Sequence, residues 1–299
     1  MVLPARYQSY AIIHFCVLLW GFTGLFGRWI SLHEVPLVWN RLLICVPMLA
    51  ALGIATKAFR GFKWNTLGKP IYVGILIAIH WVLFYGAVKY SNASVGASCL
   101  SMVAVYSSFL EPIINKRSIR WVDVLLAVIA AVGMLFIFRA QPGYFTGIIL
   151  GLLAALFSSY FTILNKDLSP HYHPIALSFY ELTSALVFIT VMLPVYFHFF
   201  PTAVLTPGKT DIELLFLFAI GATIVPFVLS LYALRDVSAF FSNLSLNLEP
   251  VYTIILAMFF FHEQTELHTG FYIGAGLILM SVVLYVVLRS GKITIPIET

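Results

Sequence analysis

Residues 233–252, ALRDVSAFFSNLSLNLEPVY, align without gaps with residues 87–106, AVKYSNASVGASCLSMVAVY. The shift is 146 residues, which places Arg235 opposite Lys89 and repeats a Val-Tyr pair at the end of both stretches. Self-similarity at a fixed spacing is the sequence signature of a duplicated architecture. The alignment therefore predicts that the chain is built from two related halves.

An earlier match extends this repeat toward the N-terminus. Pro174 aligns with Pro36 at a shift of 138 residues, and the smaller shift fits a longer loop in the second half near TAVLTPGKTD. The predicted units are residues 1–140 and 141–299, which together form one membrane domain.

The composition places both halves in a membrane. Of the 299 residues, 61% are hydrophobic and 10% are charged, and the mean hydropathy is +0.99. A soluble domain carries about 25% charged residues, so this chain cannot cover a globule with polar surface. We expect an all-α integral membrane protein in contact with the lipid bilayer.

Apolar runs long enough to cross a membrane occur ten times. A span needs about 20 apolar residues to cross the hydrocarbon core. The ten predicted spans are residues 10–30, 35–56, 70–90, 93–115, 121–138, 145–165, 174–198, 212–234, 239–261 and 270–288.

Five spans per half is an odd number, so the two halves must enter the membrane in opposite directions. The loop charges agree, because Lys116, Arg117 and Arg120 follow the fourth span, whereas Glu263 and Glu266 follow the ninth. The sequence predicts two inverted five-helix repeats, an arrangement typical of transporters.

The basic residues predict the orientation. Cytoplasmic loops are enriched in Lys and Arg. With the N-terminus inside, the cytoplasmic side holds Arg6, Lys57, Arg60, Lys63, Lys69, Lys116, Arg117, Arg120, Lys166, Arg235, Arg289 and Lys292. The other side holds Arg28, Lys89, Arg139 and Lys209. Both termini are predicted to be cytoplasmic, and the basic residues need no nucleic-acid partner.

Four stretches resemble the drug/metabolite transporter superfamily, specifically its EamA-type ten-helix members. They are LLWGFTGLFGRWI in the first span, Pro36 with Asn40-Arg41 in the second, SLNLEPVYTIILAMFFFHEQ in the ninth and GAGLILMSVVLYVV in the tenth. The resemblance implies secondary transport of small organic metabolites, often export, through a cavity lined mainly by spans 1, 3, 4, 6, 8 and 9. It also implies a multi-pass protein of a bacterial cytoplasmic (inner) membrane.

The first half departs from this family pattern. The proline expected near the start of the fourth span is Ala104, opposite Pro250, and the acidic residue expected after that span is Arg117, opposite Glu263.

Glu249 is the central candidate site residue, because it lies near the middle of the ninth span, where an ionisable group is costly and usually functional. Ser242, Ser245, Glu249 and Thr253 fall on one helical stripe, with Tyr252 at its edge. The stripe is either a substrate or proton site or a structural carboxylate paired with another span. Pro250 removes a backbone donor, which is expected to free the Leu246 carbonyl.

His80 lies at a similar depth in the third span, followed by Trp81 and Tyr85. A histidine exchanges protons near neutral pH, so His80 is a candidate partner of Glu249 or of the substrate, or it is a satisfied interhelical hydrogen bond. The two aromatic residues are candidates for a cavity wall or for filler.

Serines supply weaker candidates. Ser101 belongs to a serine-rich face of the fourth span, and Ser158 lies in the sixth. Small residues also let helices approach closely, so packing and cavity lining both remain open.

Arg41, Glu111 and Glu181 lie nearer the span ends and are candidate gate or ion-pair residues. Arg41 would otherwise bind an anionic substrate group. Glu111-Pro112 repeats the spelling of Glu249-Pro250, but the repeat register does not align the two pairs.

No catalytic, metal or cofactor site is predicted. HEQTELH, residues 262–268, has the wrong spacing for a helical zinc site and is expected to be a short solvated loop. Cys16, Cys45 and Cys99 fall inside spans and predict buried free thiols rather than disulfides.

The sequence thus favours a secondary active transporter, not an enzyme, that moves amino-acid-like or other amphipathic solutes by alternating access, with protons as a candidate coupling ion. The alternatives are a non-transporting receptor or assembly subunit and, less favoured, a membrane-embedded enzyme. Small residues at Gly270, Gly274 and Gly276 fit close packing either within the chain or in a homodimer.

Overall fold

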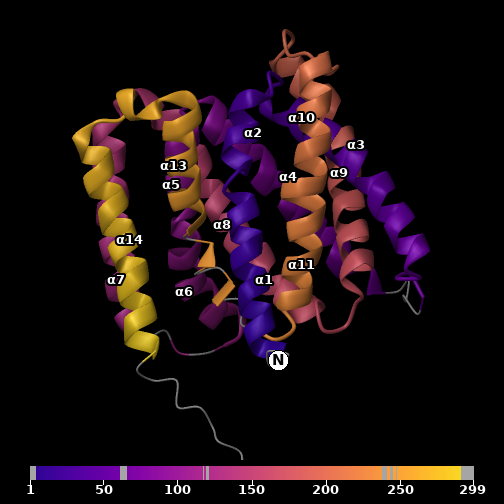
Figure 1. Ribbon diagram of the computed structural model, residues 1–299, viewed down its shortest axis with the longest axis horizontal. Coiled ribbons are helices and arrows are strands. Elements are labelled where there is room, and N and C mark those ends of the chain that lie inside the picture. Colours follow the sequence, from indigo (N-terminus) through magenta and orange to yellow (C-terminus); the bar gives the residue numbers. More distant parts are fainter. Residues whose placement is uncertain are drawn as a thin grey trace, which may run out of the picture.

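The computed structural model describes residues 5–60, 66–116, 118, 121–237, 241–242, 245–246 and 248–290. These residues form helices and connecting turns, with no strand among them (Figure 1). Four of the basic residues used to predict orientation, Lys63, Arg117, Arg120 and Lys292, lie outside the described residues.

The helices follow the order of the predicted spans. The first half contains α1 (Ala5–Trp20), α2 (Thr23–Trp29), α3 (Glu34–Ala55), α4 (Gly68–Lys89), α5 (Ala93–Leu100), α6 (Met102–Ile114) and α7 (Trp121–Ala140). The second contains η2 (Pro142–Tyr144), α8 (Phe145–Leu168), α9 (Pro174–Phe199), α10 (Lys209–Ala219), η3 (Ile220–Ile224), α11 (Val225–Ala233), α13 (Leu248–Phe261), η4 (Glu263–Thr265) and α14 (Thr269–Ser290).

Seven helical segments are long and apolar enough to cross a membrane. They are Tyr7–Trp29, Glu34–Ala55, Gly68–Lys89, Ala93–Ile114, Pro142–Leu168, Pro174–Phe199 and Lys209–Ala233. Shorter apolar helices cover Leu125–Ala140, Leu248–Phe261 and Thr269–Ser281. Each of the ten predicted runs therefore contains described helix, and the chain is a multi-pass membrane protein, while the count of ten spans stays a prediction.

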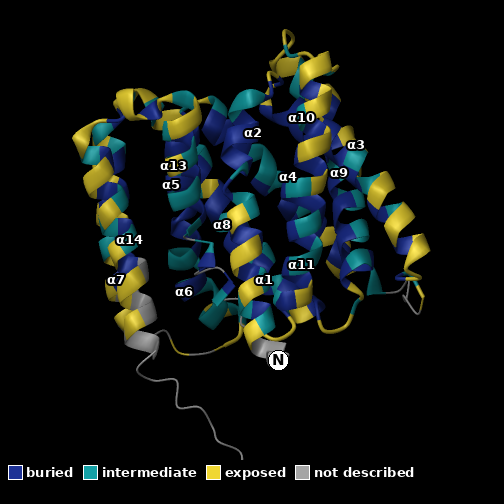
Figure 2. Cartoon of the chain, in the orientation of Figure 1, coloured by how far each residue is buried: buried dark blue, intermediate teal, exposed yellow. Residues whose placement is uncertain are grey.

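The exterior of the bundle is apolar. Val187, Val191 and Val195 recur every fourth residue along α9, and each leaves more than half of its surface exposed. Exposed residues lie along the outer faces of peripheral helices such as α14, and buried residues face the centre (Figure 2). Large exposed apolar surface is unfavourable in water but is the surface that lipid tails solvate.

Three of these segments are interrupted near their middle. The interruptions lie at Gly21-Phe22 between α1 and α2, at Ser101 between α5 and α6, and at the π-helical turn η3 between α10 and α11. Pro226 explains the last, because proline lacks an amide hydrogen and clashes with the carbonyl four residues earlier. Such breaks leave backbone groups free to bind something other than their own helix.

The α7–α14 pair is held by glycine contacts. Gly270, at the start of α14, lies against Ala140 at the end of α7, and Gly274 lies against Gly133 one turn further along, so the helices are antiparallel. Gly270 and Gly274 therefore serve packing within the chain, which is one of the two uses that the sequence left open.

A charged cluster, here called the Arg28 cluster, joins the two halves at one end of the bundle. It consists of Arg28, Asn92, Glu263, Glu266 and the first amides of α5. The Arg28 guanidinium donates to Glu263 and, at 3.0 Å, to Glu266. The Glu263 carboxylate also accepts from the amides of Ala93 at 3.1 Å and Ser94 at 2.9 Å. A carboxylate is favoured there because the first amides of a helix lack intrahelical partners and carry positive partial charge.

The prediction of a solvated HEQTELH loop is wrong for its first carboxylate, Glu263. Glu263 is 0% exposed, and Leu267 is also buried. The loop turns back at His262, which adopts a left-handed conformation with φ of 55°, and this brings Glu263 under the start of α5.

Further contacts between the halves lie at the same end. Ser31, just after α2, donates its amide and hydroxyl to Asp211 at the start of α10, at 2.9 and 2.5 Å. The hydroxyl of Tyr196 donates to Glu34 at 3.0 Å.

Lys89 and Arg235, which the repeat alignment pairs, make equivalent contacts. Lys89 donates to the carbonyl of Ile30, which ends α2. Arg235 donates at 3.0 Å to the carbonyl of Ser169, which ends α8. Each side chain thus satisfies the last carbonyls of the first span in its own half, where a cation is electrostatically favoured.

The first spans of the two halves also run in opposite directions. Tyr144, directly before α8, donates to Glu266 at 3.5 Å, and Glu266 binds Arg28 in the last turn of α2. The helix α8 therefore starts at the end of the bundle where α2 stops.

We expect Gly274→Ala to destabilise the protein and Gly276→Ala not to. A Cβ at Gly274 would lie 2.4 Å from the carbonyl oxygen of Gly133, whereas one at Gly276 would meet nothing within 4 Å. Separating α7 from α14 costs about 1–3 kcal/mol, and alanine alone favours a helix over glycine by about 1 kcal/mol. Thermal unfolding of the two purified variants provides the comparison, and equal unfolding temperatures would contradict the close contact.

Glu266 makes stability depend on pH. Burial acts to raise the pKa of its carboxyl, but hydrogen bonds from Asn92 and Arg28 and the charge of Arg28 outweigh burial and lower it. The unfolded pKa is near ~4.3, so this contribution is present above that pH and is lost as the pH falls through the lower folded value.

Glu266→Gln should therefore lower the unfolding temperature at pH 7. Its difference from the wild type should shrink as the pH falls below about 4.3 and vanish only below the lowered folded pKa of Glu266. Glu213→Gln, at an exposed position on α10, is the control and should change little at either pH. A difference for Glu266→Gln that is constant with pH would contradict this account.

Candidate functional site

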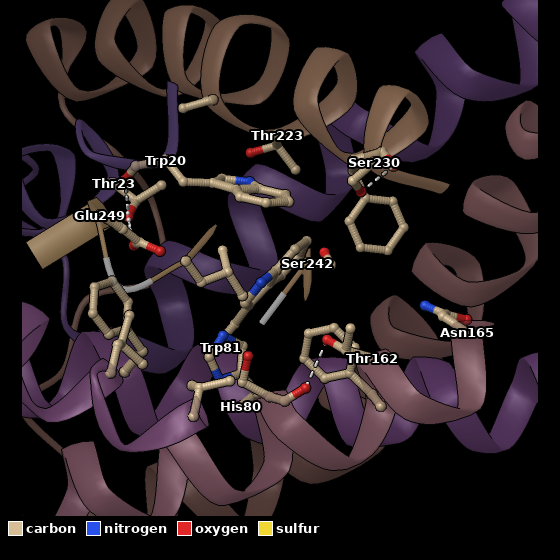
Figure 3. A pocket seen from close by; sticks show the side chains of 18 of the residues that line it. Trp20, Thr23, His80, Trp81, Thr162, Asn165, Thr223, Ser230, Ser242 and Glu249 are labelled. Carbon is tan, nitrogen blue, oxygen red and sulfur yellow. Dashed lines mark hydrogen bonds between the residues drawn. The ribbon is translucent and has the colours of Figure 1, made fainter. Parts of the chain in front are cut away.

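A cavity lies at the centre of the bundle, enclosed by helices from both halves (Figure 3). Its volume is about 90 Å³, enough for several waters or part of a small solute. The polar and charged residues that line it are Thr23, Arg41, His80, Ser158, Thr162, Asn165, Thr223, Ser230, Ser242 and Glu249. The aromatic ones are Trp20, Trp81, Phe84, Tyr85, Phe161 and Phe227.

Glu249 lies in the first turn of α13 and faces this cavity, with 6% of its surface exposed. The hydroxyl of Thr23 on α2 lies 3.3 Å from the Glu249 carboxylate. Figure 3 shows the two side chains together on one wall, beside Trp20. The predicted midplane carboxylate therefore contacts the first span at its interruption.

Two glycines allow this approach. A Cβ at Gly21 would lie 2.6 Å from Tyr252, and one at Gly24 would lie 2.8 Å from Thr253. Thr253 also donates to the carbonyl of Gly21 at 2.8 Å. The residues of the predicted polar stripe therefore have two different roles. Ser242 and Glu249 line the cavity, whereas Thr253 contacts Gly21, between α1 and α2, and Gly24 of α2.

The expected free carbonyl at Leu246 is not found. The amide of Glu249 donates to it at 2.9 Å. Pro250 removes the usual donor, and the helix start tightens by one residue to supply another.

Arg41 lies on the cavity wall rather than at a helix end. It comes from α3 and is 1% exposed. Its guanidinium carbon lies 3.6 Å from the ring centroid of Trp81 and 4.6 Å from that of Phe218, and Nη1 donates to the Tyr85 hydroxyl at 2.9 Å. No described carboxylate lies within ion-pair distance, so its gating role stays a prediction.

His80 does not contact Glu249. Its Nδ1 lies 2.8 Å from the carbonyl of Ala154 on α8, and since a carbonyl can only accept, Nδ1 carries the hydrogen. Its ring packs against Phe84 and Phe161. His80 nevertheless lines the cavity (Figure 3). It therefore makes an interhelical hydrogen bond and faces the cavity at the same time.

Six predicted cavity residues, Glu249, His80, Trp81, Tyr85, Ser158 and Ser242, line the cavity. Ser101, Ser245 and Tyr252 do not belong to its lining. Ser101 occupies the break between α5 and α6, Ser245 is buried, and Tyr252 packs on Gly21.

The two remaining gate candidates lie outside the cavity. Glu181 on α9 is fully buried, and one of its oxygens lies 3.5 Å from the amide of Asn165. Glu111 is partly buried on α6, within electrostatic range of Lys166. Their gating roles stay predictions.

Several lining residues were not predicted. Ionisable groups deep within a span are the basis of the prediction, so it does not select isolated uncharged polar residues. The residues missed in this way are Thr23, Asn165, Thr223 and Ser230. A usable signal existed for Thr23, because Gly21 and Gly24 flank it and mark a place where another helix comes close.

The arrangement is suited to binding a solute. It offers a carboxylate, a guanidinium, hydroxyls and aromatic faces around one space. Among the described residues, no group of three His, Cys, Asp or Glu side chains could hold a metal ion.

Two proteins are similar to this chain along nearly its whole length. An uncharacterized transporter, YxxF, of Bacillus subtilis (strain 168) is 21% identical over 306 residues, covering 99% of this chain and 96% of that protein. An uncharacterized transporter of Archaeoglobus fulgidus is 23% identical over 289 residues, covering 95% of this chain and 99% of that protein.

A solved crystal structure shares the fold. It aligns with a TM-score of 0.68 at 14% sequence identity, covering 95% of this chain and 98% of that one. The EamA-like transporter family matches residues 9–139 and 145–287, which is nearly the entire chain. The chain therefore belongs to the EamA-like transporter family, so its general role is transport across a membrane.

Proposed function

We propose that the protein is a secondary active transporter that moves a small organic solute by alternating access. The observation that carries this proposal is the central cavity, where Arg41 and Glu249 lie buried between helices of both halves. Buried charges are costly in a membrane and are retained where they act on a solute or ion.

The two halves, residues 1–140 and 141–299, act as inverted five-span repeats. The equivalent contacts of Lys89 and Arg235 support this relation, as do the opposite directions of α2 and α8 and the two separate family matches. Inverted repeats supply two mirror-related packings, one open to each side of the membrane.

The Arg28 cluster and the Ser31–Asp211 contact join the two halves at one end of the bundle, and we propose that they close this end in the present conformation. Alternating access requires these contacts to break when that end opens. By the distribution of Lys and Arg, this end faces away from the cytoplasm, and both termini are cytoplasmic in a bacterial inner membrane. Glu111 and Glu181 are proposed gate elements toward the other end.

The solute is proposed to be amino-acid-like or otherwise amphipathic, with export as the direction. Aromatic faces and a few polar groups around one space suit such a molecule. Glu249 is proposed to exchange the coupling proton, with Thr23 as its hydrogen-bond partner at 3.3 Å.

We expect Glu249→Gln to abolish the pH dependence of transport and to slow it by about tenfold or more, as loss of a charge-assisted contact does. The substrate would first be identified by comparing the metabolites exported by cells with and without the protein. Counterflow of that substrate in proteoliposomes, with and without a pH gradient, then gives both quantities. Glu213→Gln is the matched control, and an unchanged rate with unchanged pH dependence would exclude Glu249 as the coupling site.

A covalent bridge between Ser31 and Asp211 should stop transport. In a chain with alanine at Cys16, Cys45 and Cys99, the pair Ser31→Cys and Asp211→Cys would be joined by a short, reducible bifunctional thiol reagent. We expect transport to be lost on cross-linking and restored on reduction, while Ser31→Cys alone keeps its activity. Full transport by the cross-linked protein would show that this end need not open.

A further inference from the structure

Arg41 is a buried cation without a described counter-ion. Aromatic rings surround it, with Trp81 at 3.6 Å, Phe218 at 4.6 Å and Tyr85 at 5.1 Å from the guanidinium carbon. Cation–π contacts of this kind recover part of the cost of removing an arginine from water. These ring contacts involve the flat faces of the guanidinium, so its N–H groups stay available for hydrogen bonds.

One complete edge of Arg41 lacks a partner. Nη1 donates to the Tyr85 hydroxyl, but Nε and Nη2 are buried with no hydrogen-bond partner among the residues that the structure describes. These two nitrogens lie on the same side of the planar guanidinium, so their N–H bonds point in parallel. Unpaired donors on a buried charge are expensive, and this edge has the geometry that holds a carboxylate through two hydrogen bonds.

The surroundings favour a single negative charge. Arg41 and Glu249 line the same cavity but form no ion pair with each other. Among the described lining residues the one other ionisable nitrogen base is His80, which is engaged with Ala154. The free edge could hold either a carboxylate or a phosphate group. A phosphate group carries a charge of about −2, which one guanidinium beside the Glu249 carboxyl would not balance, whereas a carboxylate carries a single charge.

We propose that the Nε and Nη2 edge of Arg41 binds the carboxylate of the transported solute. The inference rests on the proposed transport through this cavity and narrows its substrate class to organic carboxylates. Trp81 fixes the plane of the guanidinium, and the Tyr85 hydroxyl fixes its rotation, so both are positioning residues for this contact.

Binding is tested with matched pairs of carboxylate and carboxamide. The probes are hexanoate, 3-phenylpropionate, L-leucine and L-phenylalanine, each beside its own amide, and inorganic phosphate is a separate arm. The purified full-length chain in lipid nanodiscs is titrated with each probe, and the rise in unfolding temperature gives apparent affinities. At least one carboxylate should stabilise the wild type, and its amide and phosphate should bind at least about tenfold more weakly.

Variants assign the contact to Arg41. Arg41→Lys keeps the charge but lacks the parallel edge, and should weaken the carboxylate about tenfold, whereas Arg41→Gln should weaken it about 100-fold. Tyr85→Phe retains the guanidinium and should weaken binding less while preserving the preference over the amide. The control is Arg139→Gln, at an exposed position near the end of α7, and a sharp monodisperse elution profile verifies that each variant is folded.

Four results would overturn the proposal: no carboxylate in the panel binds, the amide binds equally well, phosphate binds as tightly, or Arg41→Gln keeps the preference. Counterflow separates this failure from failure of the proposed function. If the protein transports a solute and its preference for the carboxylate does not depend on Arg41, the transport proposal stands and the Arg41 subsite is rejected. If carboxylates bind in a way that depends on Arg41 but none of them shows counterflow, the Arg41 subsite stands and the transport proposal is rejected.

Discussion

Glu263 is the residue on which the arrangement of the two halves depends most. Its carboxylate is fully buried and accepts from two amides at the start of α5 while also pairing with Arg28. The start of a helix carries unsatisfied amides and positive partial charge, and burial of Ala93 and Ser94 keeps water from satisfying them. A side chain from the second half thus completes a helix of the first half, and this fixes α5 beside α13 at the edge of the cavity.

Both ends of the bundle join the halves through carboxylates of the second half, but with different partners. At the Arg28 end, these carboxylates bind a cation and backbone amides of the first half. At the other end, Asp236 accepts from the Ser9 hydroxyl at 2.8 Å, while Lys166 and Arg235 donate to carbonyls within the second half, at 2.7 Å to Leu234 and 3.0 Å to Ser169. The residue aligned with Glu263 in the first half is Arg117. The first half therefore has no carboxylate at the position equivalent to Glu263. The contacts of Glu263 are thus particular to its own end of the bundle.

The parts of the structure that depend on local composition were predictable from sequence. Apolar runs predicted the helices because a backbone in lipid must satisfy its own hydrogen bonds, and depth within a run predicted that Glu249 faces the interior. The failures concern groups whose partner lies far away in the chain. The sequence predicts a solvated Glu263, because the partners of its carboxylate, Ala93 and Ser94, lie about 170 residues earlier. It also predicts a free Leu246 carbonyl, because helix geometry alone does not show that the Glu249 amide replaces the missing donor.

The separation of Arg41 from Glu249 is the feature that makes the cavity useful. Two opposite charges in a low-dielectric space attract strongly, and a direct pair would neutralise both and leave little to bind a solute. Arg41 instead donates to the Tyr85 hydroxyl. Glu249 lies 3.3 Å from the Thr23 hydroxyl, which also donates to the Trp20 carbonyl at 2.7 Å. A hydroxyl orients a charged group without cancelling its charge. In the proposed transport mechanism, the cost of keeping both groups buried is recovered most fully when a solute or proton occupies the space, and occupancy of the cavity is thereby coupled to the stability of the conformation that encloses it.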